Sequence, residues 1–213
     1  MAAPDPRWRR RKTARPSEIA AAALEVFAEK GYAGARLDVI AARAGISKGA
    51  LYLYFETKEE LFRAVVREAV TPNIDAARAM AEAFPGSFAQ LAPLLLERVA
   101  QVATTSRVPA VVKMVIGESR NFPDLARVWH DTVVSQAIGL ISGLVSRAQA
   151  KGEVRPGDPR LHALSLAGPL VVGILWQEVF VPVGAEPLDV SALAAQHAQT
   201  VLHGLLARPQ AAA

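Results

Sequence analysis

The amino-acid sequence predicts an all-α protein of about nine helices. Alanine and leucine are frequent and aromatic residues make up only 6% of the chain, a composition that favours helix over sheet. No segment shows the strict alternation of apolar and polar residues that is typical of strands. Prolines, glycines and capping residues instead separate helix-length segments. With 52% hydrophobic and 21% charged residues, the chain is expected to fold around a sizeable core.

The amino terminus of the chain is strongly basic. Residues 1–15 contain six basic residues and one acidic residue, whereas residues 16–67 are balanced and residues 68–213 are slightly acidic. The stretch lacks the apolar core of a secretory signal. We interpret residues 1–15 as a solvated arm that binds nucleic acid, with a transit peptide or an expression artefact as the alternatives.

A first helix is expected from Pro16 to Lys30, because proline is tolerated in the first turn and Lys30-Gly31 is a typical helix end. Its apolar residues form one broad face: Ile19, Ala20, Ala23, Leu24, Phe27 and Ala28.

The next two helices are short and are separated by a glycine. Residues 37–44 predict a helix of barely two turns, Gly45 can adopt the left-handed conformation that ends it, and Ser47 can cap a second helix running to about Phe55. This pattern describes a helix-turn-helix, whose second helix enters the major groove of DNA with its first residues facing base edges. Here those residues are Ser47, Lys48, Gly49 and Ala50.

A fourth helix begins at the capping box formed by Thr57 and Glu60 and extends to Pro85-Gly86. The free N–H groups at its start, together with Lys58, form a candidate phosphate-binding site.

The helix-turn-helix segment resembles the DNA-binding domain of tetracycline-repressor (TetR) family regulators. The resemblance covers residues 16–63, about a quarter of the chain. It rests on the order and spacing of Ala22-Ala23-Leu24, Phe27, Lys30-Gly31-Tyr32, Ile40-Ala41, Ala44-Gly45-Ile46-Ser47-Lys48-Gly49, Leu51-Tyr52, Phe55, Lys58-Glu59 and Leu61.

Two departures from the family pattern affect the expected DNA contacts. Ala35 and Arg36 replace a Thr/Ser pair, so a hydroxyl cap is lost and Arg36 adds a cation that can reach phosphate or a base. Ala50 stands where the family often has Thr, which leaves Lys48 as the main polar candidate for base reading.

By the resemblance, Tyr52, Tyr54 and Lys58 are expected to contact phosphates, with core-edge packing as the alternative for both tyrosines. Arg43 is either a DNA contact or a solvated surface charge.

Five further helices are expected beyond the fourth. The breaks and caps that bound them include Ser87, the Asn121–Asp124 segment, Lys151-Gly152, Asp158-Pro159 and Asp189. The expected helices cover residues 87–106, 108–120, 124–151, 159–180 and 189–207.

The eighth helix, residues 159–180, is apolar on nearly every side and must be covered all round. Its most apolar stretch, residues 163–176, is about fourteen residues long, shorter than the roughly 20 that a bilayer requires, so no membrane span is expected. Central burial in a monomer and burial between two subunits both satisfy the pattern. A helix-turn-helix reads two half-sites one duplex turn apart, which requires a dimer. The interface candidates are Leu166, Leu170, Val171, Ile174, Val201 and Leu205.

The regulatory part is expected to hold a pocket for an apolar or aromatic effector with one polar handle. The pocket candidates are Met114, Glu118, Phe122, Trp129, Val133, Trp176, Gln177 and Phe180, with ordinary core packing as the alternative.

Nothing in the sequence indicates catalysis. The chain has no cysteine, its four histidines do not form an i, i+4 pair with a glutamate, and no phosphate-binding glycine loop or Gly-x-Ser-x-Gly turn occurs. We expect no enzymatic activity, no cofactor and no metal site.

The resemblance thus implies a bacterial, cytoplasmic, nucleoid-associated regulator. It is expected to act as a homodimeric repressor that binds a palindromic operator and is released by a small molecule. The expected division is a basic arm (1–15), a helix-turn-helix domain (16–63) and an effector-binding and dimerisation domain (64–213). The alternative is an architectural DNA-binding protein without an effector.

Overall fold

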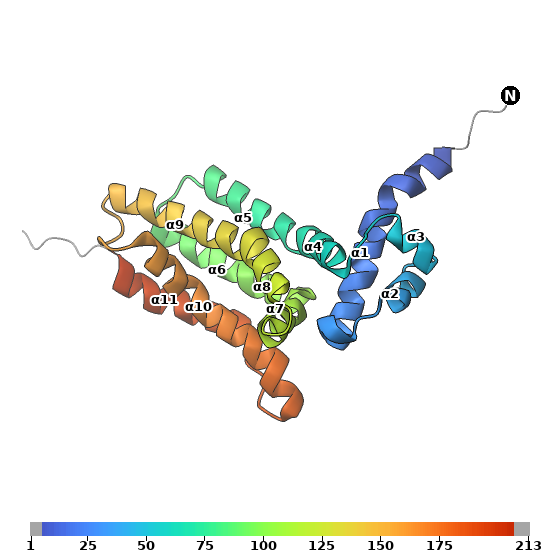
Figure 1. Ribbon diagram of the computed structural model, residues 1–213. Helices are drawn as coiled ribbons and strands as arrows, with labels where there is room; N and C mark the ends of the chain where they lie inside the picture. Colours follow the sequence, from blue (N-terminus) through green and yellow to red (C-terminus); the bar gives the residue numbers. More distant parts are fainter. Residues whose placement is uncertain (1–5, 207–213) are drawn as a thin grey trace, which may run out of the picture.

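The computed structural model describes the backbone of residues 6–206 and the side chains of residues 16–206. Within this part the expected all-α fold is confirmed, since the regular elements are helices and no strand forms. Figure 1 shows two groups of helices: α1 to α3 form a small unit at the amino-terminal end, and α5 to α11 form a larger bundle, with α4 between them.

The small unit contains α1 (Pro6–Gly34), α2 (Leu37–Arg43) and α3 (Lys48–Tyr52). The nucleic-acid-binding role of residues 1–15 stays a prediction. Residues 1–5 lie outside the described part, but from Pro6 the backbone is helical and continuous with α1. Pro6 suits a first helical turn, and the arginines, lysine and alanine that follow it favour helix.

Helix α4 (Lys58–Ala69) is followed almost directly by α5 (Thr71–Ala83), so the single fourth helix expected from the sequence is bent at Val70. Pro72 lies in the first turn of α5 and has no N–H to continue the hydrogen-bond ladder of α4, which accounts for the break.

The remaining helices begin and end close to the caps and breaks that the sequence predicts. Asp158 accepts a hydrogen bond from the N–H of Arg160, and Asp189 accepts from the N–H groups of Ser191 and Ala192, as helix caps do. The elements are α6 (Phe88–Thr105), α7 (Val108–Glu118), α8 (Pro123–Trp129), a π-helical turn (His130–Val134), α9 (Ser135–Ala150), α10 (Pro159–Leu175), a second π-helical turn (Trp176–Phe180), a 3-10 turn (Val181–Val183) and α11 (Val190–Leu205).

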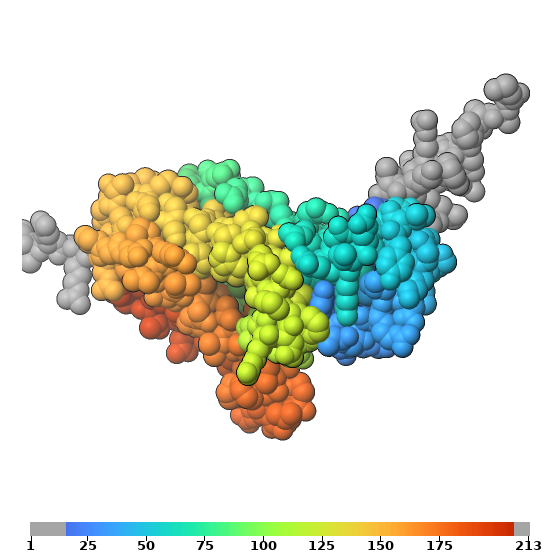
Figure 2. All heavy atoms as spheres, in the orientation of Figure 1, coloured from blue at the N-terminus to red at the C-terminus, as the bar shows by residue number. Residues whose placement is uncertain are grey.

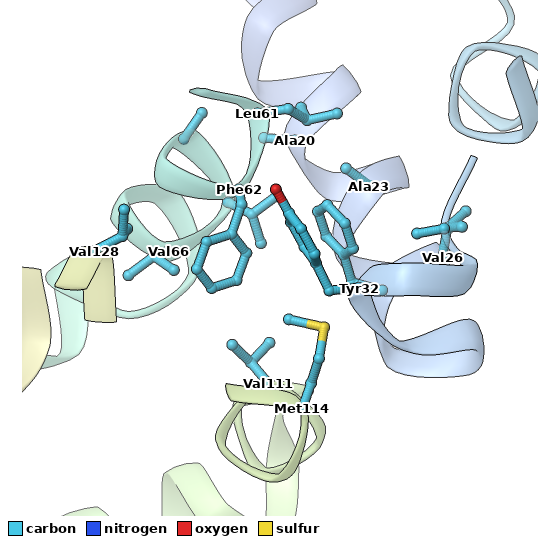
Figure 3. Close-up of a cluster of buried hydrophobic side chains, with 14 of the residues drawn as sticks. Ala20, Ala23, Val26, Tyr32, Leu61, Phe62, Val66, Val111, Met114 and Val128 are labelled. Atoms are coloured by element: carbon cyan, nitrogen blue, oxygen red, sulfur yellow. The ribbon is translucent and has the colours of Figure 1, made fainter. Parts of the chain in front are cut away.

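Two hydrophobic cores hold the described part together. One core lies within the bundle, between α6, α9, α10 and α11. The other crosses from the small unit into the bundle, because buried residues of α1, α2 and α4 pack with residues of α7 and α8. Figure 3 shows Tyr32 and Phe62 meeting Val111 and Met114 of α7 in this second core. The two units therefore share apolar packing as well as a chain connection.

The helix that begins with α10 differs from expectation in length and in burial. It continues without a break from Pro159 to Val183, so by length and composition it is able to cross a membrane, and the argument that it is too short does not hold. One face packs in the bundle core, while the opposite face is exposed, with Val172 at 63% and Leu161 at 61% of full exposure. Central burial in a monomer, one of the two alternatives, is therefore not found in the described part, and burial between two subunits stays a prediction. Its end projects from the bundle, as the orange bulge in Figure 2.

Candidate functional site

The turn between α2 and α3 has the geometry of a helix-turn-helix. Gly45 has a φ of 66°, the left-handed conformation that glycine adopts readily. The N–H of Ile46 then donates to the carbonyl of Ala41 at 3.0 Å, and the Ser47 hydroxyl accepts from the N–H of Ala50 at 3.1 Å. Leu51 is fully buried and fixes α3 on the core. The turn and the cap predicted from the sequence are both present.

The first residues of α3 face solvent. Ser47, Lys48 and Gly49 are exposed, whereas Ala50 is half-buried. The ammonium group of Lys48 lies 6.0 Å from the centre of the Tyr52 ring, and Tyr52 is itself exposed. Small residues around one cation allow the backbone of α3 to come close to a flat or grooved partner such as DNA.

Two of the predicted DNA-contacting cations are engaged in surface ion pairs. Arg43 forms a two-pronged pair with Glu29, with N–O distances of 2.7 and 2.8 Å, and its hydrogen bond lowers the pKa of Glu29. Arg36 pairs with Asp38 at 2.8 Å and lowers the pKa of that carboxyl in the same way. The Arg43 pair joins α2 to α1, and contact between Arg43 and DNA stays a prediction.

Lys58 and Tyr54 lie closer to the core than to the exposed face of α3. The Lys58 ammonium group sits 4.5 Å from the centre of the Tyr32 ring and 3.4 Å from the carbonyl oxygen of Ala33. Burial lowers the pKa of Lys58, and the negative charge of Glu118 opposes this shift. Tyr54 is half-buried against the core that the small unit and the bundle share. Lys58 thus joins α4 to the last turn of α1, a contact that the sequence did not predict.

Glu118 and Phe122, two of the pocket candidates, also contact this segment. The Glu118 carboxylate accepts hydrogen bonds from the N–H groups of Tyr32 and Ala33, both at 2.7 Å. The Phe122 ring lies 5.1 Å from the Tyr32 ring in an edge-to-face arrangement. We name the set Tyr32, Ala33, Lys58, Glu118 and Phe122 the junction cluster. In the sequence, Lys30-Gly31 indicates a helix end and Lys30-Gly31-Tyr32 contributes to the family resemblance, but neither pattern predicts these contacts of Tyr32.

The other pocket candidates do not converge on one site. Trp129 and Val133 pack on the shared core. Trp176 and Phe180 are largely exposed, with ring centres 5.4 Å apart. Gln177 accepts a hydrogen bond from the N–H of Leu188, which ties down the loop before α11. The candidates are therefore distributed over several places in the described structure, and an effector pocket formed by some of them stays a prediction.

The cavities of the described part include one of about 80 Å³ and one of about 310 Å³. The cavity of about 310 Å³ lies between α1 and α7, and its lining includes Met114, Glu118, Lys113 and Glu29. Met114 and Glu118 are thus the pocket candidates that reach it.

Most of the dimer-interface candidates lie on the wrong side of their helices for contact with a second subunit. Leu166, Leu170, Ile174 and Leu205 are each at least nine-tenths buried in the single chain. The three leucines belong to the core within the bundle, and Ile174 belongs to the core that crosses into the small unit. Val171 is exposed and Val201 is partly exposed, so these two remain available. The exposed apolar residues of α10 are Leu161, Leu164, Val171 and Val172.

Comparison with known proteins identifies both parts of the chain. Residues 19–65 match the family described as bacterial regulatory proteins, tetR family, and residues 86–189 match the tetracyclin repressor-like C-terminal domain. The HTH-type transcriptional regulator RutR of Escherichia coli K12 is 32% identical over 162 residues, which cover 70% of this chain and 68% of RutR.

Solved structures share the fold at lower identity. A TetR-family regulator from Mesorhizobium loti superposes with a TM-score of 0.77 at 22% identity, covering 92% of this chain and 98% of that one. The regulator FadR of Bacillus subtilis, solved in complex with stearoyl-CoA, gives a TM-score of 0.73 at 21% identity, covering 88% of this chain and 98% of FadR.

Proposed function

Because the chain belongs to the TetR family of bacterial transcriptional regulators, we propose that it represses transcription by binding a palindromic operator through α3. The observation that carries this proposal is the exposed start of α3, where Ser47 and Gly49 flank the single cation Lys48. Ser47, Lys48, Gly49, Ala50 and Tyr52 form the proposed reading surface. The relatives are transcriptional regulators rather than enzymes, and the proposal includes no catalytic step.

The experiment for this function is the Lys48→Ala variant. If Lys48 reads a base, its loss costs about 1–3 kcal/mol, chiefly at one base position of the operator. Affinity is measured by fluorescence anisotropy on sequences selected from a random DNA pool and on their single-base variants. Lys151→Ala, which removes an equally exposed cation from the far part of the chain, serves as the control and is expected to bind like wild type. An equal loss on every sequence would assign Lys48 to phosphate contact instead.

We propose further that a second copy of the chain covers the exposed face of α10. Leu161, Leu164, Val171 and Val172 present apolar side chains to solvent along the outer face of this helix. A contiguous apolar patch of this kind favours an interface. TetR-family regulators function as dimers, and two reading helices must be held about 34–36 Å apart to enter successive major grooves. A dimer through α10 would cover this apolar face and supply the second reading helix.

The remaining elements of the proposal concern the effector and the cell. Residues 16–63 are assigned to DNA binding and residues 64–213 to effector binding and dimerisation, in a cytoplasmic protein associated with the nucleoid. We propose an apolar effector with one polar handle, and the fold similarity to FadR with stearoyl-CoA makes acyl-CoA thioesters the first class to test.

Effector binding is tested by thermal shift with a panel of acyl-CoA thioesters and smaller aromatic compounds. A ligand at a hundred times its Kd stabilises the folded protein by about 2.7 kcal/mol, which raises the melting temperature measurably. The same ligand is expected to release the operator. Operator binding that no stabilising ligand changes would favour the alternative, an architectural protein without an effector.

A further inference from the structure

The last turn of α1, which leads into the helix-turn-helix, is set off from the rest of the helix by a kink. At Gly31 the backbone leaves the helix, with φ 69° and ψ 178°, and helical geometry resumes at Tyr32. The N–H of Ala35 donates back to the carbonyl of Gly31 at 3.2 Å, which closes the turn. The first N–H groups of such a turn have no partner within it and need an acceptor.

The acceptor comes from the other part of the molecule. The two carboxylate oxygens of Glu118, at the end of α7, accept from the N–H groups of Tyr32 and Ala33 at 2.7 Å each. A local Ser, Thr or Asp usually fills this role, whereas here the cap lies 86 residues along the chain from Tyr32. The positive φ of Gly31 favours glycine at this position, and a Cβ there would also force the Glu118 carboxylate to shift.

Other contacts of the junction cluster hold the same turn. The carbonyl of Glu118 accepts from the N–H of Phe122 at 2.9 Å, and this places the Phe122 ring against Tyr32. On α4, Lys58 contacts the Tyr32 ring and the carbonyl of Ala33. Helix α7 also contacts the π-helical turn that continues α10. Lys113 forms an ion pair with the Glu178 carboxylate at 3.2 Å and donates a hydrogen bond to the Glu178 carbonyl at 3.1 Å.

These contacts form a continuous link from the π-helical turn after α10 to the helix-turn-helix. Lys113 joins the π-helical turn to α7, Glu118 joins α7 to the turn at Tyr32, and the turn at Tyr32 leads directly into α2 and α3. We propose that Glu118 is a positioning residue: its carboxylate caps the turn at Tyr32 and fixes the orientation of the helix-turn-helix on the regulatory bundle. The expected effect on operator binding rests on the proposed function of α3. The orientation of the helix-turn-helix is measurable without DNA.

The first test measures the orientation by double electron–electron resonance in Glu118→Gln. Because the chain has no cysteine, Ala42→Cys and Ser146→Cys, at exposed positions on α2 and α9, give two specific labels. Dilution with unlabelled protein isolates the distance within one chain. We expect a narrow distance distribution with Glu118 and a broader one with glutamine, since an amide presents only one acceptor oxygen to two N–H groups.

The structure supplies a matched control in Glu153. Its carboxylate accepts from the N–H of Phe88, the first residue of α6, at 2.7 Å, but both groups lie in the regulatory part. Glu153→Gln removes the same charge from a carboxylate with one N–H partner and is expected to keep the narrow distribution. A distribution in Glu118→Gln and in the shorter Glu118→Asp as narrow as in wild type would overturn the proposal, provided circular dichroism shows folded protein.

The second test separates positioning from general destabilisation. Operators are prepared with the selected half-site spacing and with one base pair inserted or removed. Glu118→Gln is expected to bind the selected spacing about tenfold more weakly, roughly the effect of one charge-assisted hydrogen bond, and to discriminate less between spacings. Glu153→Gln keeps wild-type discrimination. A uniform loss at all spacings contradicts positioning, whereas a wild-type protein that binds no operator contradicts the proposed function and leaves the distance measurement to decide on Glu118.

Discussion

Val172→Glu is expected to convert the protein from a dimer to a monomer and to abolish specific operator binding. Val172 is 63% exposed on the outer face of α10, among other apolar residues. In the proposed dimer the substitution buries carboxylates from both copies without partners, which costs several kcal/mol. Light scattering should then report about 22.7 kDa rather than twice that mass. Because specific binding exceeds non-specific binding by at least about a thousandfold, operator affinity is expected to fall by that order.

The control for this prediction is Val99→Glu, the same change at an exposed valine on α6. It is expected to remain dimeric and to bind DNA like wild type. A dimeric Val172→Glu protein would place the interface elsewhere. A wild-type protein that is monomeric in solution and cosediments with lipid vesicles would instead assign the apolar face of α10 to a membrane.

Deletion of residues 1–15 is expected to weaken binding to all DNA sequences. This segment contains six basic residues against one acidic residue, and each phosphate that a cation neutralises contributes about 0.9 to the slope of log K against log salt. The slope should therefore fall by several units. Base discrimination should stay unchanged, because phosphate contacts carry no direct sequence information. The described buried residues of α1 begin at Ile19, so the deletion leaves them in place.

A charge-neutral variant of the same length distinguishes charge from helix length. In it, the six basic residues of the segment, Arg7, Arg9, Arg10, Arg11, Lys12 and Arg15, are replaced by glutamine. We expect the salt slope of this variant to match that of the deletion. A slope equal to that of the wild type in both variants would exclude contact between this segment and DNA.

Local signals in the sequence predicted most helix boundaries correctly. Gly45, Ser47 and Thr57 each act within a few residues of the chain, and the structure shows the left-handed glycine and both hydroxyl caps at these positions. Asp158 and Asp189 open α10 and α11 for the same reason. A turn or cap depends on its neighbours in sequence, so it can be identified from a single chain.

The exposed face of α10 could not be predicted from the sequence. When nearly every position of a helix is apolar, the periodicity carries no information about which side faces the core. Leu166 and Leu170 were chosen as interface residues, yet they pack inside the bundle, while Leu161 and Val172 face outward. The choice between these faces depends on where α6, α9 and α11 lie, which is a property of the tertiary fold.

The junction cluster was missed for a related reason. Glu118 is a polar residue at a helix end, and nothing in its neighbours points to N–H groups at Tyr32 and Ala33. The helix start at Lys58 and the family resemblance predict a phosphate contact, which stays a prediction, but neither points to the contact of Lys58 with the Tyr32 ring. Contacts between residues distant in sequence require the arrangement of both units to be known.

The hydrophobic core that crosses from α1 and α4 into α7 and α8 has a consequence for folding. Phe62, fully buried, packs on Phe27 and Tyr32 while α7 covers the same cluster, so neither unit can open without exposing apolar surface of the other. The described part therefore unfolds cooperatively, and a melting temperature reports on both units together. A destabilising substitution in the regulatory bundle is thus expected to lower the fraction of molecules with a folded helix-turn-helix, even where the substituted residue lies far from DNA.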